Sequence, residues 1–218
     1  MPILEFKNVS KKYGSIQALK DVNFSVDEGE FVFLTGPSGA GKTTILKLLM
    51  REVSPTTGEV LFDGKKIHSL KRKDIPLLRQ SIGVVFQDFR LLPERTIREN
   101  IEVALAVRGV AKKEWLARVD QVLKLVGLSD RSDLFPSQLS GGELQRAVLS
   151  RALVLNPKLI FADEPTGNLD WETTEGIMDL LVKINAEGKT IVVTTHNRDI
   201  IKKLKKREIK IKKGAVEE

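Results

Sequence analysis

The chain has 218 residues, 41% of them hydrophobic, with no cysteine, two histidines and a net charge of +7. This length is sufficient to bury one apolar core, while the lack of cysteine excludes disulfides, thiolate nucleophiles and cysteine-ligated zinc, so any metal is expected to have mainly oxygen ligands. Without a signal-peptide pattern, or an apolar run near the roughly 20 residues of a membrane helix, the sequence predicts a soluble cytoplasmic protein.

Three stretches near the N-terminus alternate between apolar and polar residues. Such alternation is typical of antiparallel strands with one wet face, and Asp63-Gly64 marks a turn within the third stretch. A β subdomain is therefore expected beside the core. The stretches are residues 4–9, 19–26 and 60–67.

Four further runs are short and mainly apolar, with helical patterns between them. This arrangement is typical of a buried parallel sheet, so the sequence predicts an α/β fold. The runs are residues 31–35, 82–86, 159–163 and 190–195.

A glycine-rich segment joins the first of these runs to a helical pattern from Thr44 to Met50. Its glycines let backbone N–H groups turn toward an anion, and the helix N-terminus adds positive potential. The segment predicts a phosphate loop in which Lys42 reaches the outer phosphates of ATP and the Thr43 hydroxyl ligates Mg²⁺. The residues expected to contact the nucleotide are Gly36, Pro37, Ser38, Gly39, Ala40, Gly41, Lys42, Thr43 and Thr44.

Polar side chains follow the other apolar runs, at the sheet edge where ligands bind in a doubly wound fold. We expect Asp163 to hold Mg²⁺ through water and Glu164 to accept a proton from the water that attacks the γ-phosphate. Gln87 suits a contact to metal and water, and His196 a bond to the γ-phosphate or water that also orients Glu164. Taken singly, each would be an ordinary turn, cap or structural residue. The expected catalytic residues are Lys42, Gln87, Glu164 and His196, and the expected metal ligands are Thr43, Gln87 and Asp163.

The pattern changes to helix from about residue 88 to 156. One apolar stripe indicates a helix in an insert that packs on the core as a semi-rigid arm. Its residues are Trp115, Val119, Val122, Leu123 and Val126.

The insert contains a second glycine motif, which runs from Leu139 to Arg146 and precedes a helix through Leu153. It is either a helix cap alone or a further phosphate cradle. Because it lies on the insert, we do not expect it to reach the chain's own phosphate loop, so a second chain would bring its nucleotide there. The contacting residues would be Ser140, Gly141, Gly142 and Glu143.

Positive charge gathers near the C-terminal end. Residues 198–213 contain nine Lys or Arg against two acidic residues, an excess equal to the net charge of the chain. A solvated face is the first interpretation, and attraction to anionic lipid is the alternative. The alternation from Glu208 to Lys212 predicts an edge strand whose lysines oppose aggregation.

Together and in this order, the motifs resemble the nucleotide-binding subunit of ABC transporters over essentially the whole chain. The resemblance implies one ABC ATPase domain, residues 1–218. Its RecA-like P-loop NTPase core and antiparallel β subdomain would comprise residues 1–87 and 157–218, and its helical subdomain residues 88–156. It implies a Mg²⁺-dependent ATPase that forms a homodimer on ATP binding, each signature motif (Leu139 to Gln145) capping the ATP of the other subunit.

Two further roles follow from the resemblance alone. Tyr13, the only tyrosine, occupies the position that stacks on adenine, and Asp170 that of the D-loop aspartate. On packing frequency alone, Tyr13 would be an ordinary aromatic at a strand end. Leu144 departs from the usual Gln of the signature, and the lysine-rich tail is also unusual.

Within the family, the run from Asp163 to Asp170 resembles the branch with lipoprotein-release, macrolide-export and cell-division ATPases. The stretch from Phe86 to Thr96 looks most like the cell-division members. Resemblance to these members implies an integral membrane permease as partner, which holds the chain at the inner face of the plasma membrane. Through this permease the ATP cycle would control cell-wall hydrolases. We expect the permease beside Asp88 to Arg95, where Phe89, Leu91 and Leu92 are too apolar for a free loop.

Two other functions stay open at this point. One is an exporter or lipoprotein-release ATPase, which only the stretch from Gln87 to Thr96 separates from the first. The other is a relative that acts on nucleic acid or ribosomes, suggested by the basic tail. No nucleic acid is expected, because such relatives usually carry two nucleotide domains or a long coiled-coil insert and this chain has neither.

Overall fold

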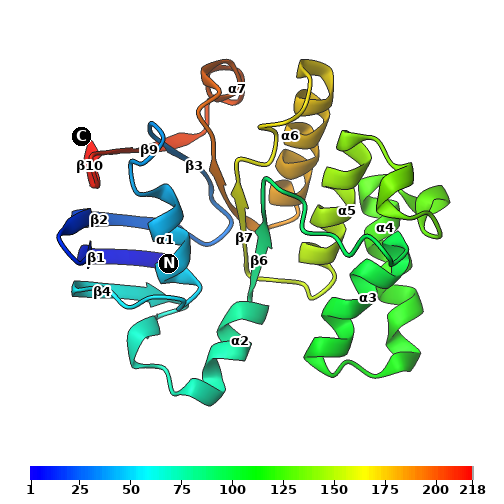
Figure 1. Ribbon diagram of the computed structural model, residues 1–218, viewed down its shortest axis with the longest axis horizontal. Helices are drawn as coiled ribbons and strands as arrows, with labels where there is room; N and C mark the ends of the chain where they lie inside the picture. The colour runs from blue at the N-terminus through cyan, green and yellow to red at the C-terminus, as the bar shows by residue number, and fades with distance from the viewer. Residues whose placement is uncertain (218) are drawn as a thin grey trace.

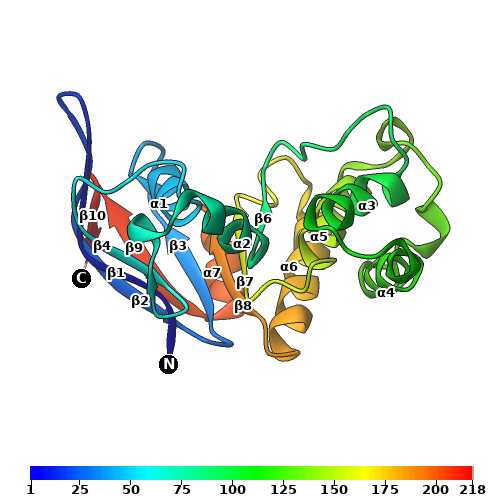
Figure 2. The same cartoon turned by 90° about the horizontal axis from the view of Figure 1, so that it is seen from below.

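The computed structural model describes residues 1–217, so Glu218, the last residue of the expected domain, lies outside the described residues. An antiparallel sheet lies at one end of the molecule, a mainly parallel sheet at the centre and a layer of helices at the other end (Figures 1 and 2). No helix in the described part of the chain is long and apolar enough to cross a bilayer.

The elements follow one another along the chain as follows. The strands are β1 (Pro2–Tyr13), β2 (Ile16–Asp27), β3 (Phe31–Thr35), β4 (Thr57–Phe62), β5 (Lys65–Lys66), β6 (Ile82–Val85), β7 (Leu159–Asp163), β8 (Thr190–Thr194), β9 (Arg207–Lys212) and β10 (Ala215–Glu217). The α-helices are α1 (Lys42–Leu49), α2 (Ile75–Gln80), α3 (Ile97–Arg108), α4 (Trp115–Val126), α5 (Gly141–Leu153), α6 (Trp171–Ala186) and α7 (Arg198–Leu204). The 3₁₀ turns are η1 (Ile67–Ser69), η2 (Arg72–Asp74), η3 (Lys112–Glu114), η4 (Ser129–Arg131) and η5 (Pro136–Gln138).

The parallel sheet has the order β10-β9-β3-β8-β7-β6, and the four predicted buried strands are confirmed as β3, β6, β7 and β8. Alternate residues of β3 enter two separate cores, because successive side chains of a strand point to opposite faces. Phe31 and Phe33 pack with helices α3 to α6, whereas Val32 and Leu34 pack with α1 and the antiparallel sheet. Burial on both faces explains why these strands are apolar throughout.

The antiparallel sheet has the order β2-β1-β4-β5 and confirms the predicted β subdomain. Asp63 and Gly64 form the tight turn between β4 and β5, with φ of 51° and 71°. Two positive φ angles in succession are typical of the two-residue turn that matches the twist of a hairpin. Helix α1 lies between this sheet and the parallel sheet (Figure 2). The glycine-rich segment that joins β3 to α1 therefore lies near the centre of the molecule.

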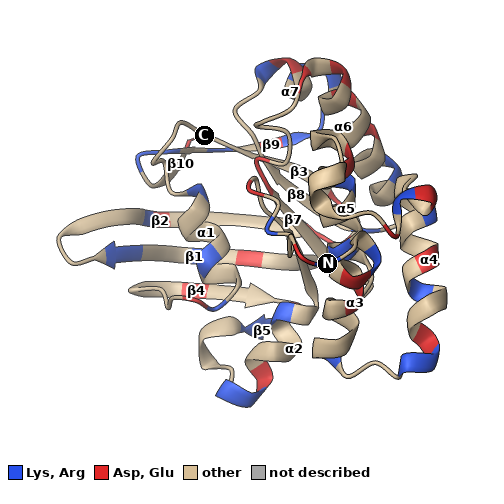
Figure 3. Cartoon of the chain, turned by 45° about the vertical axis from the view of Figure 1, so that its right-hand side comes forward, with Lys and Arg blue, Asp and Glu red and all other residues tan. Residues whose placement is uncertain are grey.

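The basic segment differs from its expected structure. Strand β9 is an interior strand, because it pairs with β3 on one side and with β10 on the other, so the edge-strand prediction is wrong. The short β10 supplies the edge, and three residues are too few to be recognised from a pattern. Lys203, Arg207 and Lys212 form ion pairs with Glu175, Glu30 and Glu217 at 2.6, 2.9 and 2.8 Å, and acidic residues lie among the basic ones on α6 and α7 (Figure 3).

We call residues 88–156 the helical arm. The predicted stripe of α4 is confirmed: Val119, Val122, Leu123 and Val126 are buried, and Trp115 is half-buried and donates from its indole N–H to the Val110 carbonyl at 2.8 Å. The buried residues of the arm belong to the same apolar cluster as one face of the parallel sheet. The arm is therefore packed on the core rather than tethered to it.

Asn100 of α3 is expected to be a main support of the loop that enters the arm. Its buried amide accepts from the Leu92 N–H at 2.7 Å and donates to the carbonyls of Leu92, Arg95 and Thr96 at 3.0, 3.1 and 3.0 Å. Asn100→Ala leaves these groups without their partner, so we expect a loss of about 2–3 kcal/mol in the free energy of unfolding. Urea denaturation measures this, with the exposed Gln121→Ala as control; equal stability of the two variants would contradict it.

Candidate functional site

The glycine-rich segment after β3 is confined by strands on both sides. A Cβ on Gly36, whose φ is 148°, would lie 2.1 Å from the Ile211 carbonyl oxygen, and one on Gly41, with φ of 116°, 2.6 Å from a Leu19 methyl. Only glycine fits these positions. Helix α1 begins after Gly41 without a side-chain cap, so its first N–H groups are free to bind an anion in the loop.

Lys42 lies across this loop. Its buried ammonium donates to the carbonyls of Gly36 and Pro37 at 2.6 and 3.1 Å and stands 4.0 Å from Glu164 Oε1. Because the ammonium is held mainly by neutral carbonyls, it can exchange them for the oxygens of an entering anion. The open N–H groups, the glycines and this cation suit a nucleotide phosphate.

Both acidic residues at the end of β7, Asp163 and Glu164, are positioned by one side chain that the sequence did not mark. Thr194, on β8, donates its hydroxyl to Asp163 Oδ1 at 2.6 Å and accepts from the Glu164 N–H at 2.9 Å. Glu164 has a φ of 46°, an uncommon value for a residue with a Cβ, and its N–H also contacts the Thr194 carbonyl at 3.1 Å. Thr194 thus holds the Asp163 carboxyl group and the Glu164 backbone at the same time.

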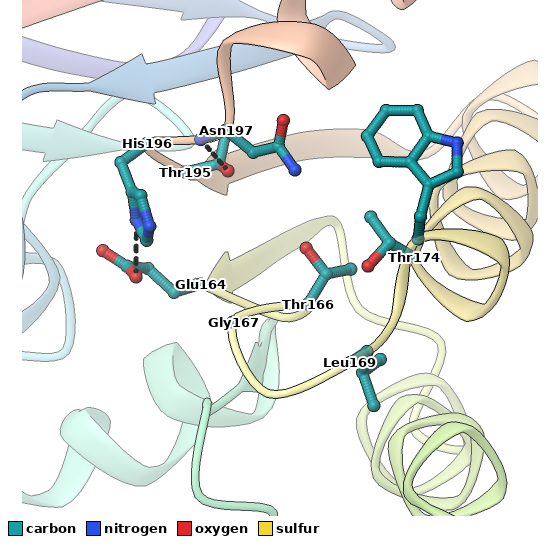
Figure 4. A pocket seen from close by; sticks show the side chains of 9 residues that line it. Glu164, Thr166, Gly167, Leu169, Thr174, Thr195, His196 and Asn197 are labelled. Atoms are coloured by element: carbon teal, nitrogen blue, oxygen red, sulfur yellow. Dashed lines mark hydrogen bonds and ion pairs between the residues drawn. The ribbon is translucent and has the colours of Figure 1, made fainter.

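The Glu164 side chain points at His196. The imidazole Nδ1 lies 3.0 Å from Glu164 Oε2, at the wall of a cavity of about 200 Å³ (Figure 4). The Glu164 carboxyl group therefore lies between His196 and Lys42. The sheet thus brings together three residues that are far apart in the sequence.

Gln87 reaches the same region from the end of β6. A Cβ on Gly167 would lie 2.9 Å from Gln87 Nε2, so the amide rests against the loop that follows Glu164. Neighbouring parallel strands β6, β7 and β8 thus deliver Gln87, the two acids and His196 to one edge.

The candidate metal ligands suit a hard cation that is shared with a phosphate. Thr43 offers an exposed hydroxyl in the first turn of α1, Asp163 a carboxylate and Gln87 an amide oxygen. Within residues 1–217 there is no cluster of three or more His, Cys, Asp or Glu that could hold a metal by itself. One carboxylate with neutral oxygens fits Mg²⁺, which usually keeps waters and takes phosphate oxygens as further ligands.

The second glycine motif caps α5 through a reciprocal pair of bonds. Ser140 Oγ accepts from the Glu143 N–H at 3.3 Å, while the Ser140 N–H donates to Glu143 Oε2 at 2.9 Å. The Ser140 hydroxyl also donates to Glu143 Oε2 at 2.8 Å, and Arg131 Nε donates to Oε1 at 2.9 Å. These bonds, led by the one from the Ser140 N–H, lower the pKa of Glu143 to about 2. The carboxyl group is therefore ionised at neutral pH.

The structure does not bring this motif to the phosphate loop. Helix α5 lies on the face of the parallel sheet opposite α1, among α3, α4 and α6 (Figures 1 and 2). Gly141 instead lies against Leu169 and Gly142 against Thr173, at the start of α6. There Asp170 accepts from the Thr173 N–H at 2.9 Å, and this bond lowers the pKa of Asp170. Half of the predicted nucleotide site thus stands apart from the other half.

Tyr13 lies at the end of β1 with 39% of its surface exposed. The ammonium of Lys11 is 4.9 Å from the centre of its ring. The same hairpin continues into Ala18 and Leu19, which contact Gly41 of the phosphate loop. An aromatic ring is thus available on the hairpin that borders the loop.

The apolar loop residues after Gln87 are only partly free. Phe89 and Leu91 are half-buried and pack against the core, whereas Leu92 is 44% exposed. Phe89 and Leu91 are therefore not part of a free loop, and the docking of a partner beside Asp88 to Arg95 stays a prediction. Their apolar character is explained by packing inside the chain.

The close contact between Gly142 and Thr173 gives a testable packing prediction. A Cβ at position 142 would lie 2.4 Å from Thr173 Cγ2, so Gly142→Ala should cost about 1–3 kcal/mol of unfolding free energy by overpacking. Adding Thr173→Ser removes the obstructing methyl, keeps the hydroxyl bond to Asp170 and should restore stability. Gly176→Ala on α6, with open space around it, should instead stabilise by about 0.5–1 kcal/mol. Thermal unfolding measures all four proteins; failure of the double variant to recover would contradict the contact.

Comparison with known proteins gives a consistent result. A protein-family model described as ABC transporter matches residues 19–167. The cell division ATP-binding protein FtsE of Streptococcus pneumoniae serotype 2 is 48% identical over 217 residues, covering 99% of this chain and 94% of the relative. FtsE of Escherichia coli K12 is 42% identical, covering 97% of this chain and 96% of the relative.

Solved structures match over nearly the whole chain as well. The dimeric ABC transporter cassette MJ0796 is 42% identical with a TM-score of 0.88, covering 99% of this chain and 97% of that one. A dimeric post-hydrolysis state of MJ0796 with bound ADP and phosphate is 41% identical with a TM-score of 0.87 and the same coverage.

Proposed function

Because this chain belongs to the ABC transporter family and is an ATPase, we propose that it is the ATP-hydrolysing subunit of a membrane complex of the FtsE/FtsX type. The observation that carries the proposal is the division of the site. The hydrolytic residues Lys42, Glu164 and His196 lie together, while the cap around Ser140 lies apart. A second copy of the chain is needed to complete each site.

In the proposed site, the loop from Gly36 to Thr44 holds the phosphates of ATP. Lys42 exchanges its bonds to the Gly36 and Pro37 carbonyls for bonds to the outer phosphates, and Tyr13 stacks on adenine. Thr43, Gln87 and Asp163 would hold Mg²⁺, which would supply positive charge to the transferring phosphoryl group.

Hydrolysis uses Glu164 as the general base. Its carboxylate accepts a proton from the water that attacks the γ-phosphate, while Lys42 offsets the charge on the phosphate oxygens. His196, 3.0 Å from Glu164, holds the carboxylate toward that water. Thr194 supports this arrangement by fixing the backbone of Glu164.

The dimer is proposed to close head to tail on ATP. Ser140, Gly141, Gly142 and Glu143 of one subunit then cap the nucleotide on the phosphate loop of the other. Ser140 must give up the hydroxyl bond that it now donates to Glu143 in order to donate to a phosphate oxygen. Closing and reopening of the dimer is the motion delivered to the membrane partner.

The cell-division role is proposed because the FtsE relatives match almost the full length of the chain. An integral membrane permease of the FtsX kind would hold the protein at the cytoplasmic face of the plasma membrane and pass the motion to cell-wall hydrolases. The alternative is the ATPase of a lipoprotein-release or macrolide-type exporter. Anionic lipid contact by residues 198–213 would be secondary, because Lys203, Arg207 and Lys212 already have acidic partners.

The test is copurification with a co-expressed membrane permease of the FtsX kind. Leu92→Asp places a charge on the exposed part of the loop, and we expect retention of the permease to fall at least tenfold while ATP binding is unchanged. Leu116→Asp, on an exposed leucine elsewhere on the arm, is the matched control. Equal retention of both variants would reject this docking face, and hydrolysis that depends on a transported substrate would favour the exporter.

A further inference from the structure

The loop that carries the chain from β6 into the helical arm contains two consecutive strained residues. Phe89 and Arg90 have φ of 47° and 52°, in the left-handed region that is unfavourable for a residue with a Cβ. They follow Gln87 by two and three positions. The place of the Gln87 amide therefore depends on how this turn is held.

Arg151 holds the turn from the signature-bearing helix α5. Its Nη1 donates to the Arg90 carbonyl at 2.6 Å and its Nη2 to the Phe89 carbonyl at 3.1 Å, so one guanidinium binds the carbonyls of both strained residues. The planar fork of arginine suits two neighbouring acceptors, which a lysine ammonium does not match. The Arg90 side chain points elsewhere, onto the Phe86 ring at 3.8 Å and to Asp88 at 3.0 Å.

This use of Arg151 is energetically unusual. It has no ion pair among residues 1–217, and its burial together with the charge of Arg90 lowers its pKa. A cation in such a place costs desolvation energy that two neutral carbonyls repay only in part. Its contribution is geometric, because it connects two segments more than 60 positions apart in the sequence.

The two ends of α5 are therefore connected to different parts of the site. Its N-terminal residues are Gly141 and Gly142 behind the Ser140 cap, and its last full turn carries Arg151. Helix α5 is a rigid rod of roughly 20 Å at 1.5 Å per residue. A tilt of α5 therefore moves the Ser140 cap and the Gln87 turn together.

We propose that Arg151 is a positioning residue that links the orientation of the signature helix to the place of Gln87. Through this link, capping of the second chain's nucleotide at Ser140 shifts Gln87, which faces the metal and the attacking water in the chain's own site. This inference rests on the roles proposed above for Ser140 and Gln87. Arg151 itself touches neither nucleotide nor water.

Amide hydrogen exchange on the full chain without nucleotide tests whether Arg151 holds the turn at Phe89 and Arg90. Arg151→Met keeps an unbranched apolar stem and removes both donors, so exchange in peptides covering residues 86–95 should accelerate at least tenfold, with α3 unchanged. Arg151→Lys should give an intermediate rate, because one ammonium cannot serve both carbonyls equally. The control is Arg118→Met on α4, which removes a surface pair with Glu114. Unchanged exchange in Arg151→Met would overturn the proposal.

ATP-driven dimerisation tests the link. In a Glu164→Gln background, Arg151→Met should raise the ATP concentration for half-maximal dimer about tenfold, as measured by light scattering. Adding Arg90→Gly should restore slow exchange in residues 86–95, because glycine adopts the left-handed turn without a clamp, but it should not restore the dimer, because the connection to α5 is still absent. A purely structural role for Arg151 would be rescued by Arg90→Gly, so recovery of the dimer in that variant, or no effect of Arg151→Met, would overturn the link. If Glu164→Gln alone forms no dimer, the proposed function fails, and the exchange experiment still decides the role of Arg151.

Discussion

Glu164→Gln is expected to lower the rate of ATP hydrolysis by at least 100-fold while leaving ATP binding intact. The amide cannot accept the proton of the attacking water, and a positioned general base typically contributes 10²- to 10⁴-fold. The local structure should persist, because Thr194 holds position 164 through its backbone N–H and a glutamine can still accept from His196. The variant should therefore accumulate as an ATP-bound dimer.

Steady-state hydrolysis and light scattering with Mg·ATP measure the two parts of this prediction. The matched control is Glu187→Gln, which makes the same change on an exposed residue after α6. Equal turnover by wild type and Glu164→Gln would show that another group accepts the proton. Loss of turnover without a dimer would show that the two halves of the site do not meet between chains.

Lys42→Met is expected to weaken ATP binding by roughly 10- to 150-fold, the factor that follows from losing charge-assisted hydrogen bonds of about 1.5–3 kcal/mol. The ammonium is the buried cation of the phosphate loop and bonds the Gly36 and Pro37 carbonyls before the nucleotide enters. Methionine keeps the apolar stem and has no donor.

Titration with a fluorescent ATP analogue in Mg²⁺ measures the affinity. Lys47→Met, on the exposed side of the same helix, should bind as wild type does. Unchanged affinity in Lys42→Met would mean that backbone N–H groups alone hold the phosphates. The Glu164 and Lys42 variants thus separate hydrolysis from binding, because only the second is expected to lose the nucleotide.

The parts of the fold that could be predicted depend on patterns within single segments. β3, β7 and β8 are buried on both faces, so their continuous apolar runs identified them directly. The edge-strand prediction for β9 was wrong, because an alternating strand has the same pattern whether or not a further strand pairs with it. Likewise the apolar character of Phe89 and Leu91 does not by itself distinguish packing inside the chain from contact with a partner, and the structure shows packing against the core.

The sequence by itself determined the phosphate loop, the helix cap at Ser140 and the two acids at the end of β7, because each depends on residues within a few positions of one another or on the end of one strand. Only the tertiary structure decided which side chains set their geometry. Thr194 holds Asp163 and Glu164 from the next strand, Thr173 limits Gly142 from another helix, and Arg151 holds the turn after Gln87 from 61 and 62 positions away. Such contacts follow from how β6 to β8 and α5 pack, and packing partners distant in the chain leave no periodicity or motif in either segment.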